Sequence, residues 1–228
     1  MSRLDTYLPT AMASARAMLP RRFMRFVMNP SIDKAIAAVA IVPFVYPIIH
    51  HFRSFGFNLP DVGYVLQTAI LVGTMVIRNP PVRVTANPLF WLLAFLATYW
   101  GFLAIGLENH GTQVAPSWIT DSITILGLIG IFWARISLGR NIGFVPAQRE
   151  IVMHGAYRFI RHPIYAVIFL SIIGAMLERW SLRNAIALSG GILLFGVKSF
   201  IEEGVLKNDP AYVAYMRRVP HRFIPGVF

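Results

Sequence analysis

Six long apolar runs, separated by short polar segments, constrain the fold of this chain more than any other feature. They lie at about residues 33–52, 59–78, 88–108, 117–138, 164–178 and 183–201. An α-helix needs about 20 apolar residues to cross a bilayer core ~30 Å thick, and most of the runs approach that length. We therefore predict an all-α, polytopic membrane helix bundle with about six spans. Since the fifth run is short, we expect it to form a tight hairpin with the sixth; five spans with a partly re-entrant pair are the alternative.

The composition favours membrane helices over one large soluble core. Of 228 residues, 56% are hydrophobic and only 14% are charged, whereas soluble domains are about 25% charged. Cysteine is absent, which excludes disulfides, thiolate nucleophiles and cysteine-based metal sites. The net charge of +11 would suit nucleic acid, but basic residues of a membrane protein more simply face the cytoplasm and anionic lipid. We therefore predict no nucleic-acid partner and no metal site.

The distribution of basic residues predicts the orientation of the bundle. In the six-span arrangement, all but three of the 21 lysines and arginines fall on one side; the exceptions are Arg53, Arg179 and Arg183. The positive-inside rule places that side, and both termini, in the cytoplasm. Residues 139–163 and 202–228 then lie on the same face, so a cytoplasmic active site can be built from both.

Three regions differ in texture along the chain. Residues 1–30 are rich in arginine and lack a signal-peptide core, which favours an amphipathic interfacial segment on the inner leaflet over a transit peptide. Residues 31–134 are expected to form transmembrane helices with few reactive groups. Residues 135–228 combine the helical hairpin with polar clusters and a polar tail, in which an Asn-Asp-Pro turn at residues 208–210 is expected to precede a short helix at residues 211–218. The C-terminal region is therefore the expected catalytic part.

A polar cluster at residues 154–165 precedes the fifth apolar run. Because proline disfavours the helical conformation of the residue before it and suits the first helical position, a helix is expected to begin at Pro163 with His162 beside its N-terminus. Free N–H groups at such an end favour an anion, and Arg161 and Arg158 add guanidinium donors for a carboxylate or phosphate. Tyr165 follows at the same helix end.

Glu202 and Glu203 follow the sixth apolar run and supply negative charge. Adjacent helix positions do not share a face, so one glutamate is expected to point into the bundle and the other outward. An inward glutamate near Arg161 would complete a site with a positive and a negative pole, which suits a zwitterionic ligand. Alternatively, the arginine–glutamate pair holds two helices together and the basic residues are topology anchors.

Several of these motifs occur together in one order, at residues 138–141, 155–165, 202–203, 212–215 and 224–226. In this combination the chain resembles the isoprenylcysteine carboxyl methyltransferase and phospholipid methyltransferase family of integral membrane enzymes, over about residues 135–228. One departure is Ala156, where many members have proline. The resemblance implies S-adenosylmethionine as cofactor. The residues it implicates in holding the cofactor are Gly155, Tyr157, His162, Pro163, Tyr165, Glu202 and Glu203, with Glu203 favoured over Glu202.

The resemblance also implies in-line methyl transfer to a lipid-like or prenylated acceptor. A carboxylate acceptor needs no base but needs a cation to orient it, for which Arg161 or Arg158 is the candidate. An amine acceptor must lose a proton, for which His162 or a glutamate is the candidate. A phospholipid N-methyltransferase acting on amino lipids is the main alternative. A membrane NADPH-dependent sterol-type reductase and a non-enzymatic transporter or scaffold are the others.

Overall fold

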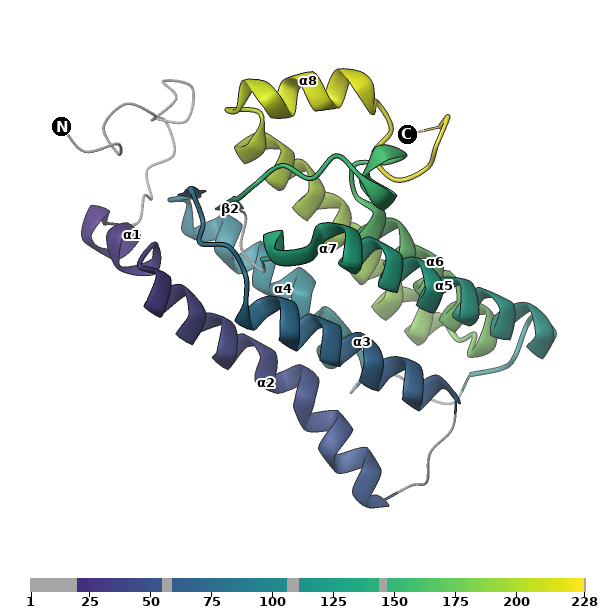
Figure 1. The fold of residues 1–228 in the computed structure, drawn as a ribbon. Coiled ribbons are helices and arrows are strands. Elements are labelled where there is room, and N and C mark those ends of the chain that lie inside the picture. The colour runs from purple at the N-terminus through teal and green to yellow at the C-terminus, as the bar shows by residue number, and fades with distance from the viewer. Residues whose placement is uncertain (1–19, 55–58, 106–110, 144–146, 228) are drawn as a thin grey trace.

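The computed structural model describes residues 20–54, 59–105, 111–143 and 147–227, so most of the predicted interfacial segment at residues 1–30 lies outside the described residues. The chain is mostly helical, which confirms the main part of the predicted fold (Figure 1). The elements are α1 (Arg21–Val27), α2 (Pro30–Ser54), α3 (Leu59–Val76), β1 (Arg83–Val84), α4 (Pro88–Ile105), α5 (Ser117–Leu138), η2 (Gly139–Asn141), β2 (Ala147–Gln148), η3 (Gly155–Arg158), α6 (Pro163–Glu178), α7 (Leu182–Leu206) and α8 (Pro210–Arg218).

Each of the six apolar runs corresponds to one helix, α2 to α7. The hairpin between the fifth and sixth runs is confirmed, since α6 ends at Glu178 and α7 begins at Leu182. The Ser181 hydroxyl caps α7 by accepting a hydrogen bond from the Asn184 N–H at 3.1 Å. The sixth helix is longer than its apolar run, because it continues to Leu206. Glu202 and Glu203 therefore lie within α7, about one turn before its end.

Glycines let the central helices approach closely. A Cβ atom on Gly130 of α5 would lie 2.7 Å from Val167 of α6, and one on Gly190 of α7 would lie 2.6 Å from the Trp100 ring of α4. Trp100 also donates its indole N–H to the Ala187 carbonyl of α7 at 2.7 Å. Small residues at such contacts are typical of helices that pack within a membrane. They bring α5 against α6 and α4 against α7.

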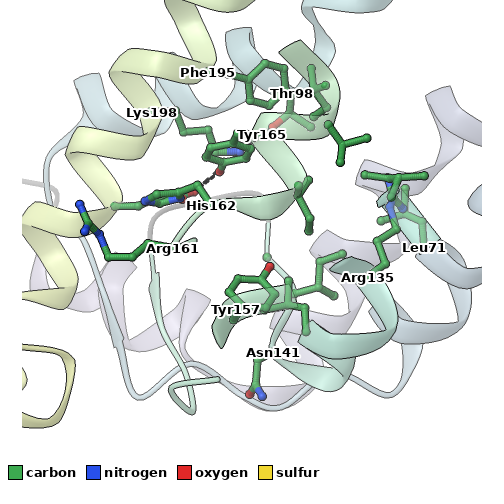
Figure 2. Close-up of a pocket in the computed structure, with 18 of the residues that line it drawn as sticks. Leu71, Thr98, Arg135, Asn141, Tyr157, Arg161, His162, Tyr165, Phe195 and Lys198 are labelled. Atoms are coloured by element: carbon green, nitrogen blue, oxygen red, sulfur yellow. Dashed lines mark hydrogen bonds and ion pairs between the residues drawn. The ribbon is translucent and has the colours of Figure 1, made fainter. Parts of the chain in front are cut away.

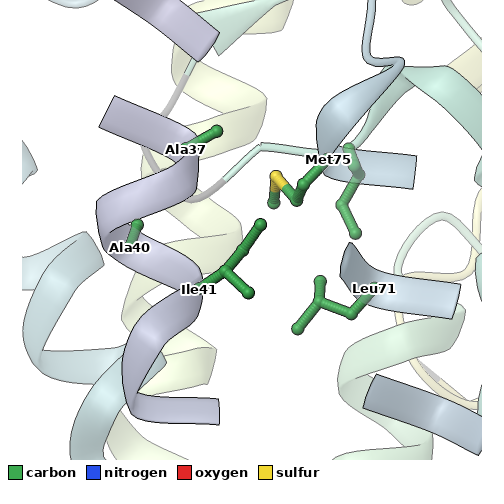
Figure 3. Close-up of a cluster of buried hydrophobic side chains, with 6 residues drawn as sticks. Ala37, Ala40, Ile41, Leu71 and Met75 are labelled. Atoms are coloured by element: carbon green, nitrogen blue, oxygen red, sulfur yellow. The ribbon is translucent and has the colours of Figure 1, made fainter. Parts of the chain in front are cut away.

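A cluster of buried apolar side chains joins α2 and α3 (Figure 3). Met75 is fully buried at its centre and packs with Leu71 and Ile41. Ile142, which follows η2, belongs to the same cluster. The N-terminal helix pair is thereby attached to the region that was expected to carry the chemistry.

The surface of the bundle fits a membrane environment. Two helical stretches, Ser117–Asn141 and Leu182–Leu206, are long and apolar enough to cross a bilayer, and only about a quarter of each is buried. Large apolar residues on them, such as Trp118 and Leu193, are about 70% exposed, which a water-soluble surface rarely tolerates in such number. The shorter apolar helices are Val65–Val76, Pro88–Trp100 and Pro163–Glu178. Six spans and cytoplasmic termini remain predictions.

A polar cap covers the end of the bundle at which α6 begins and α7 ends. The strands β1 and β2 pair antiparallel there, with Arg83 opposite Gln148 and Val84 opposite Ala147. Figure 1 shows α8 lying across this end. Its first turn is capped by Asp209, whose carboxylate accepts from the Ala211 N–H at 2.8 Å. The short helix predicted after the Asn-Asp-Pro turn is thus confirmed.

Candidate active site

A cavity of about 620 Å³ runs from the polar cap into the helix bundle, and Figure 2 shows side chains from several elements around it. Its volume lies within the usual range of small-molecule sites. The lining residues on α6 extend from Ile164 to Ala175, about 16 Å along the helix at ~1.5 Å per residue. Polar groups gather at the Tyr165 end, whereas Ile131, Ile168 and Leu188 form an apolar wall between α5, α6 and α7. One cavity therefore offers both a polar and an apolar compartment.

The start of α6 has the geometry expected from the sequence. The helix begins at Pro163, and His162 is the N-cap residue with a non-helical conformation. The His162 carbonyl accepts the first helical hydrogen bond from the Ala166 N–H at 3.0 Å. His162, Arg161 and Tyr165 all line the cavity. Proline geometry thus brings three of the predicted site residues to one place.

Glu203 lies at the centre of a buried ion cluster. Its carboxylate accepts hydrogen bonds from Arg161 Nε at 2.8 Å and from Arg222 Nε and Nη2 at 3.1 and 2.7 Å. His162 Nε2 lies 3.2 Å from the same carboxylate, and the Glu203 side chain is only 1% exposed. We call Glu203, Arg161, His162 and Arg222 the Glu203 cluster. All of these partners are side chains of the protein itself. Glu203 does not line the cavity.

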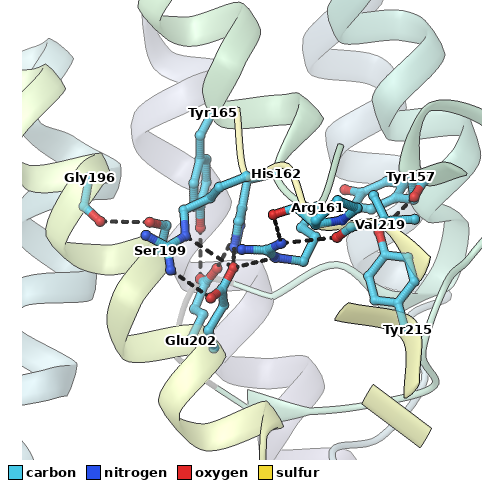
Figure 4. Close-up of polar contacts among 12 residues, drawn as sticks. Tyr157, Arg161, His162, Tyr165, Gly196, Ser199, Glu202, Tyr215 and Val219 are labelled. Carbon is cyan, nitrogen blue, oxygen red and sulfur yellow. Dashed lines mark hydrogen bonds and ion pairs between the residues drawn. The ribbon is translucent and has the colours of Figure 1, made fainter. Parts of the chain in front are cut away.

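The other glutamate, Glu202, does line the cavity. Its carboxylate accepts a hydrogen bond from the Tyr165 hydroxyl at 2.7 Å (Figure 4) and lies 4.0 Å from Lys198 Nζ. Lys198 also lines the cavity, donates to the Thr98 hydroxyl at 3.0 Å and lies 5.8 Å from the centre of the Tyr165 ring. The structure thus places a carboxylate, an ammonium and an aromatic ring together on one wall.

The remaining predicted site residues lie at different distances from the cavity. Tyr157 lines it, whereas Pro163 is buried behind it as the first residue of α6. Arg158 is exposed and lies over the Phe159 ring, 5.2 Å from its centre. Gly155 has a positive φ of 56°, and a Cβ there would lie 2.1 Å from the Ser137 hydroxyl. Gly155 therefore allows η3 to approach α5, where the Ser137 hydroxyl accepts from the Ala156 N–H.

Several cavity residues were not predicted. Lys198 is one of them, although it lies one helical turn before Glu202 and therefore on the same face. Tyr212 and Tyr215 of α8 also line the cavity, and the Tyr215 hydroxyl donates to the Tyr157 carbonyl at 2.6 Å. Their spacing of three, which places both on one face of a short helix, was the available signal.

Burial keeps the hydroxyl groups of Tyr157, Tyr212 and Tyr215 protonated by raising their pKa. Burial, followed by the nearby negative charge of Glu203, raises the pKa of Tyr212 above its ordinary value of 10.0. Burial is also the largest cause that raises the pKa of Tyr215, and Arg161 partly opposes it. Burial and the charge of Glu202 raise the pKa of Tyr157 as well. The tyrosines therefore act as neutral hydrogen-bonding groups at physiological pH.

Comparison with known families supports the resemblance drawn from the sequence. Residues 117–209 match the profile of the phospholipid methyltransferase family. This segment extends from α5 into the turn before α8 and contains the start of α6 and both glutamates. The predicted family resemblance is therefore confirmed for this segment.

A curated relative is similar over part of the chain. The nickel-cobalt-cadmium resistance protein NccN of Alcaligenes xylosoxydans xylosoxydans is 27% identical over 123 residues, which cover 52% of this chain and 58% of that protein. The similarity thus spans little more than half of each. Within the described part of this chain, no group of three or more His, Cys, Asp or Glu side chains is arranged to hold a metal ion.

Proposed function

We propose that this protein is an integral membrane methyltransferase that uses S-adenosylmethionine and modifies a lipid-like or prenylated acceptor. The observation that carries the proposal is a continuous cavity whose polar end adjoins the start of α6 and whose other end is apolar. Most of its lining residues lie in the segment that matches the phospholipid methyltransferase family. A polar cofactor and an apolar acceptor tail can share such a cavity.

The cavity wall formed by Glu202, Lys198 and Tyr165 fits the chemistry of this cofactor. A zwitterionic amino-acid group requires an acceptor for its ammonium and a donor for its carboxylate, and Glu202 and Lys198 supply one of each. A sulfonium is attracted to aromatic faces, which Tyr165 and Tyr157 provide. When bound, S-adenosylmethionine supplies a methyl group on a positively charged sulfur.

The chain contributes mainly by positioning the reactants and excluding water. In-line transfer requires the acceptor atom to approach the methyl group from the side opposite the sulfur. Arg135 lines the cavity as a cation that can orient an acceptor carboxylate. Arg161, which the sequence suggested for this task, has its guanidinium bound to Glu203 and to the Val219 carbonyl. For an amine acceptor, His162 is the group positioned to take the proton.

The apolar wall supports a lipid-like acceptor. Ile131, Ile168 and Leu188 come from three helices of the bundle, and each buried CH₂ group of an acceptor tail contributes roughly 0.8 kcal/mol of binding free energy. A small polar acceptor would leave this wall without a partner. Prenylated carboxylates and amino lipids both meet the requirement of an apolar tail with a nucleophilic head.

The proposal is tested with purified protein in detergent or nanodiscs. Thermal unfolding is followed with S-adenosylhomocysteine and, separately, with NADPH. We expect a higher unfolding temperature with S-adenosylhomocysteine only, because ligand binding stabilises the native state. Stabilisation by NADPH alone would instead favour a reductase. Transfer of labelled methyl groups to total membrane lipid, compared with transfer to a prenylcysteine analogue, then identifies the acceptor class.

A further inference from the structure

The tail that follows α8 is attached to the start of α6 through the backbone. The Arg161 N–H donates to the His221 carbonyl and the His162 N–H donates to the Arg222 carbonyl, each at 3.0 Å. The Arg161 guanidinium also donates to the Val219 carbonyl at 2.9 Å and to the Pro220 carbonyl. These contacts join segments about 60 residues apart in the sequence. The tail is therefore a structural part of the site, although it lies outside the segment that matches the family.

Two consecutive tail residues restrict His162 from different directions. Phe223 lies with its ring centre 5.9 Å from the imidazole, while Tyr165 stacks on the imidazole at 5.3 Å and an interplanar angle of 11°. Arg222 holds the Glu203 carboxylate with both Nε and Nη2, and its guanidinium carbon lies 3.8 Å above the centre of the Phe200 ring. The tail thus contributes both to the ring position of His162 and to the binding of Glu203, its hydrogen-bond partner.

This arrangement decides which imidazole nitrogen carries the proton. Two guanidinium groups surround Glu203, so it is held as a carboxylate and can only accept hydrogen bonds. We therefore assign the proton to His162 Nε2, which lies 3.2 Å from that carboxylate. In a neutral imidazole this leaves Nδ1 as the acceptor. Nδ1 lies 3.9 Å from Glu202 Oε2, on the side of the glutamate that lines the cavity.

We propose that Arg222 and Phe223 are positioning residues that hold His162 as the Nε2–H tautomer, with Nδ1 directed toward the cavity side. Arg222 acts through Glu203, and Phe223 acts by contact with the imidazole. A methyl acceptor that must lose a proton would then meet an unprotonated Nδ1, which can accept that proton. This catalytic consequence rests on the proposed function, whereas the tautomer and ring position do not.

The experiment is NMR of protein with isotope-labelled histidine at neutral pH, in which the ring nitrogen shifts report the tautomer. We expect the wild-type His162 to show one set of signals, those of Nε2–H. In Arg222→Met the signals should become those of a mixture of tautomers, because the Glu203 carboxylate loses its bidentate hydrogen bonds from Arg222. Arg222→Lys should restore part of the wild-type pattern. Arg218→Met removes an exposed arginine of α8 and is the matched control, which should resemble the wild type.

A second measurement separates this inference from the proposed function. S-adenosylhomocysteine affinity is measured by calorimetry for the same proteins, and we expect a loss of about 10-fold or more in Arg222→Met. Absence of binding to the wild type would defeat the proposed function while leaving the tautomer result standing. The inference itself is overturned if wild-type His162 is the Nδ1–H tautomer, or if Arg222→Met leaves its signals unchanged. If Arg222→Met does not fold, the wild-type spectrum and the spectrum of Phe223→Leu test the inference instead. We expect Phe223→Leu to broaden the His162 signals.

Discussion

Two buried carboxylates in this protein are each shared by two arginines, one in the N-terminal half and one in the C-terminal half. Asp33, in the first turn of α2, accepts from Arg78 Nε at 2.7 Å and lies 3.5 Å from Arg149 Nη2. All three side chains are at most 10% exposed. We call these residues the Asp33 cluster. The Glu203 cluster repeats the same arrangement and adds a histidine.

The two clusters differ in what lies beside them. The Asp33 cluster fastens α2 to the end of α3 and to the segment after β2, where Arg149 also donates to the Asn79 carbonyl at 2.9 Å. Burial and the charge of Arg78 lower the pKa of Arg149 to about 10, and Asp33 opposes this change. In the Glu203 cluster, the preceding residue Glu202 faces the cavity. A buried carboxylate bound by two arginines therefore stabilises the fold in both places. The carboxylate that belongs to the candidate site is the neighbouring one, Glu202.

The largest effect is expected for Glu203→Gln. The change leaves Arg161 and Arg222 buried without an anion, and breaking a buried ion pair in this way costs about 4–5 kcal/mol of stability. We also expect loss of S-adenosylhomocysteine binding, because His162 loses its partner. Chemical denaturation and calorimetry measure the two effects. A variant that retains wild-type stability would show that the Glu203 cluster does not stabilise the fold.

A smaller effect, confined to stability, is expected for Asp33→Asn. Arg78 keeps its hydrogen bond to the Asp33 carbonyl, at 2.6 Å in the wild type, so we expect a loss of about 3 kcal/mol, at the low end for a buried pair. The affinity of the folded protein for S-adenosylhomocysteine should not change, because Arg149, the one member of the Asp33 cluster that lines the cavity, keeps its hydrogen bond to the Asn79 carbonyl. The same denaturation and calorimetry measure both quantities. A selective loss of affinity would remove the distinction between the clusters.

The smallest effect is expected for Tyr215→Phe, which removes one hydrogen bond of the polar cap and costs about 1 kcal/mol. The pH dependence is more informative. Because burial raises the pKa of Tyr215 in the folded protein, its contribution is complete below pH ~10, the ordinary tyrosine value, and is lost as pH rises above it. The wild type should therefore lose stability above that pH, and Tyr215→Phe should lose less. Thermal unfolding at pH 9 and 10.5, as approximate settings, tests this; equal slopes would contradict it.

Local chain chemistry made much of this architecture predictable. The apolar runs predicted the helices from α2 to α7 because each needs only length and continuity of apolar residues. The start of α6 followed from the geometry around Pro163, and α8 followed from the Asn-Asp-Pro turn. These features depend on neighbouring residues, so no knowledge of tertiary contacts was required.

The pairing of the charged groups was not predictable in the same way. Helical periodicity separates the faces of Glu202 and Glu203 but does not say which face meets the cavity, and the sequence analysis favoured Glu203 as the ligand group. Which glutamate faces the cavity depends on the path of the C-terminal tail. Arg222 of the tail, 19 residues further along the sequence, binds the Glu203 carboxylate. Lys198 was within reach of a sequence argument, because one helical turn separates it from Glu202.

Calorimetry of S-adenosylhomocysteine with Glu202→Gln tests most directly whether the cavity beside the Glu203 cluster is the cofactor site. Glu178→Gln, which changes a glutamate at the exposed end of α6, is the matched control. We predict binding by the wild type and the control, and at least about 10-fold weaker binding by Glu202→Gln, with nearly unchanged unfolding temperatures. Equal affinity of Glu202→Gln and the wild type would contradict the assignment of this cavity.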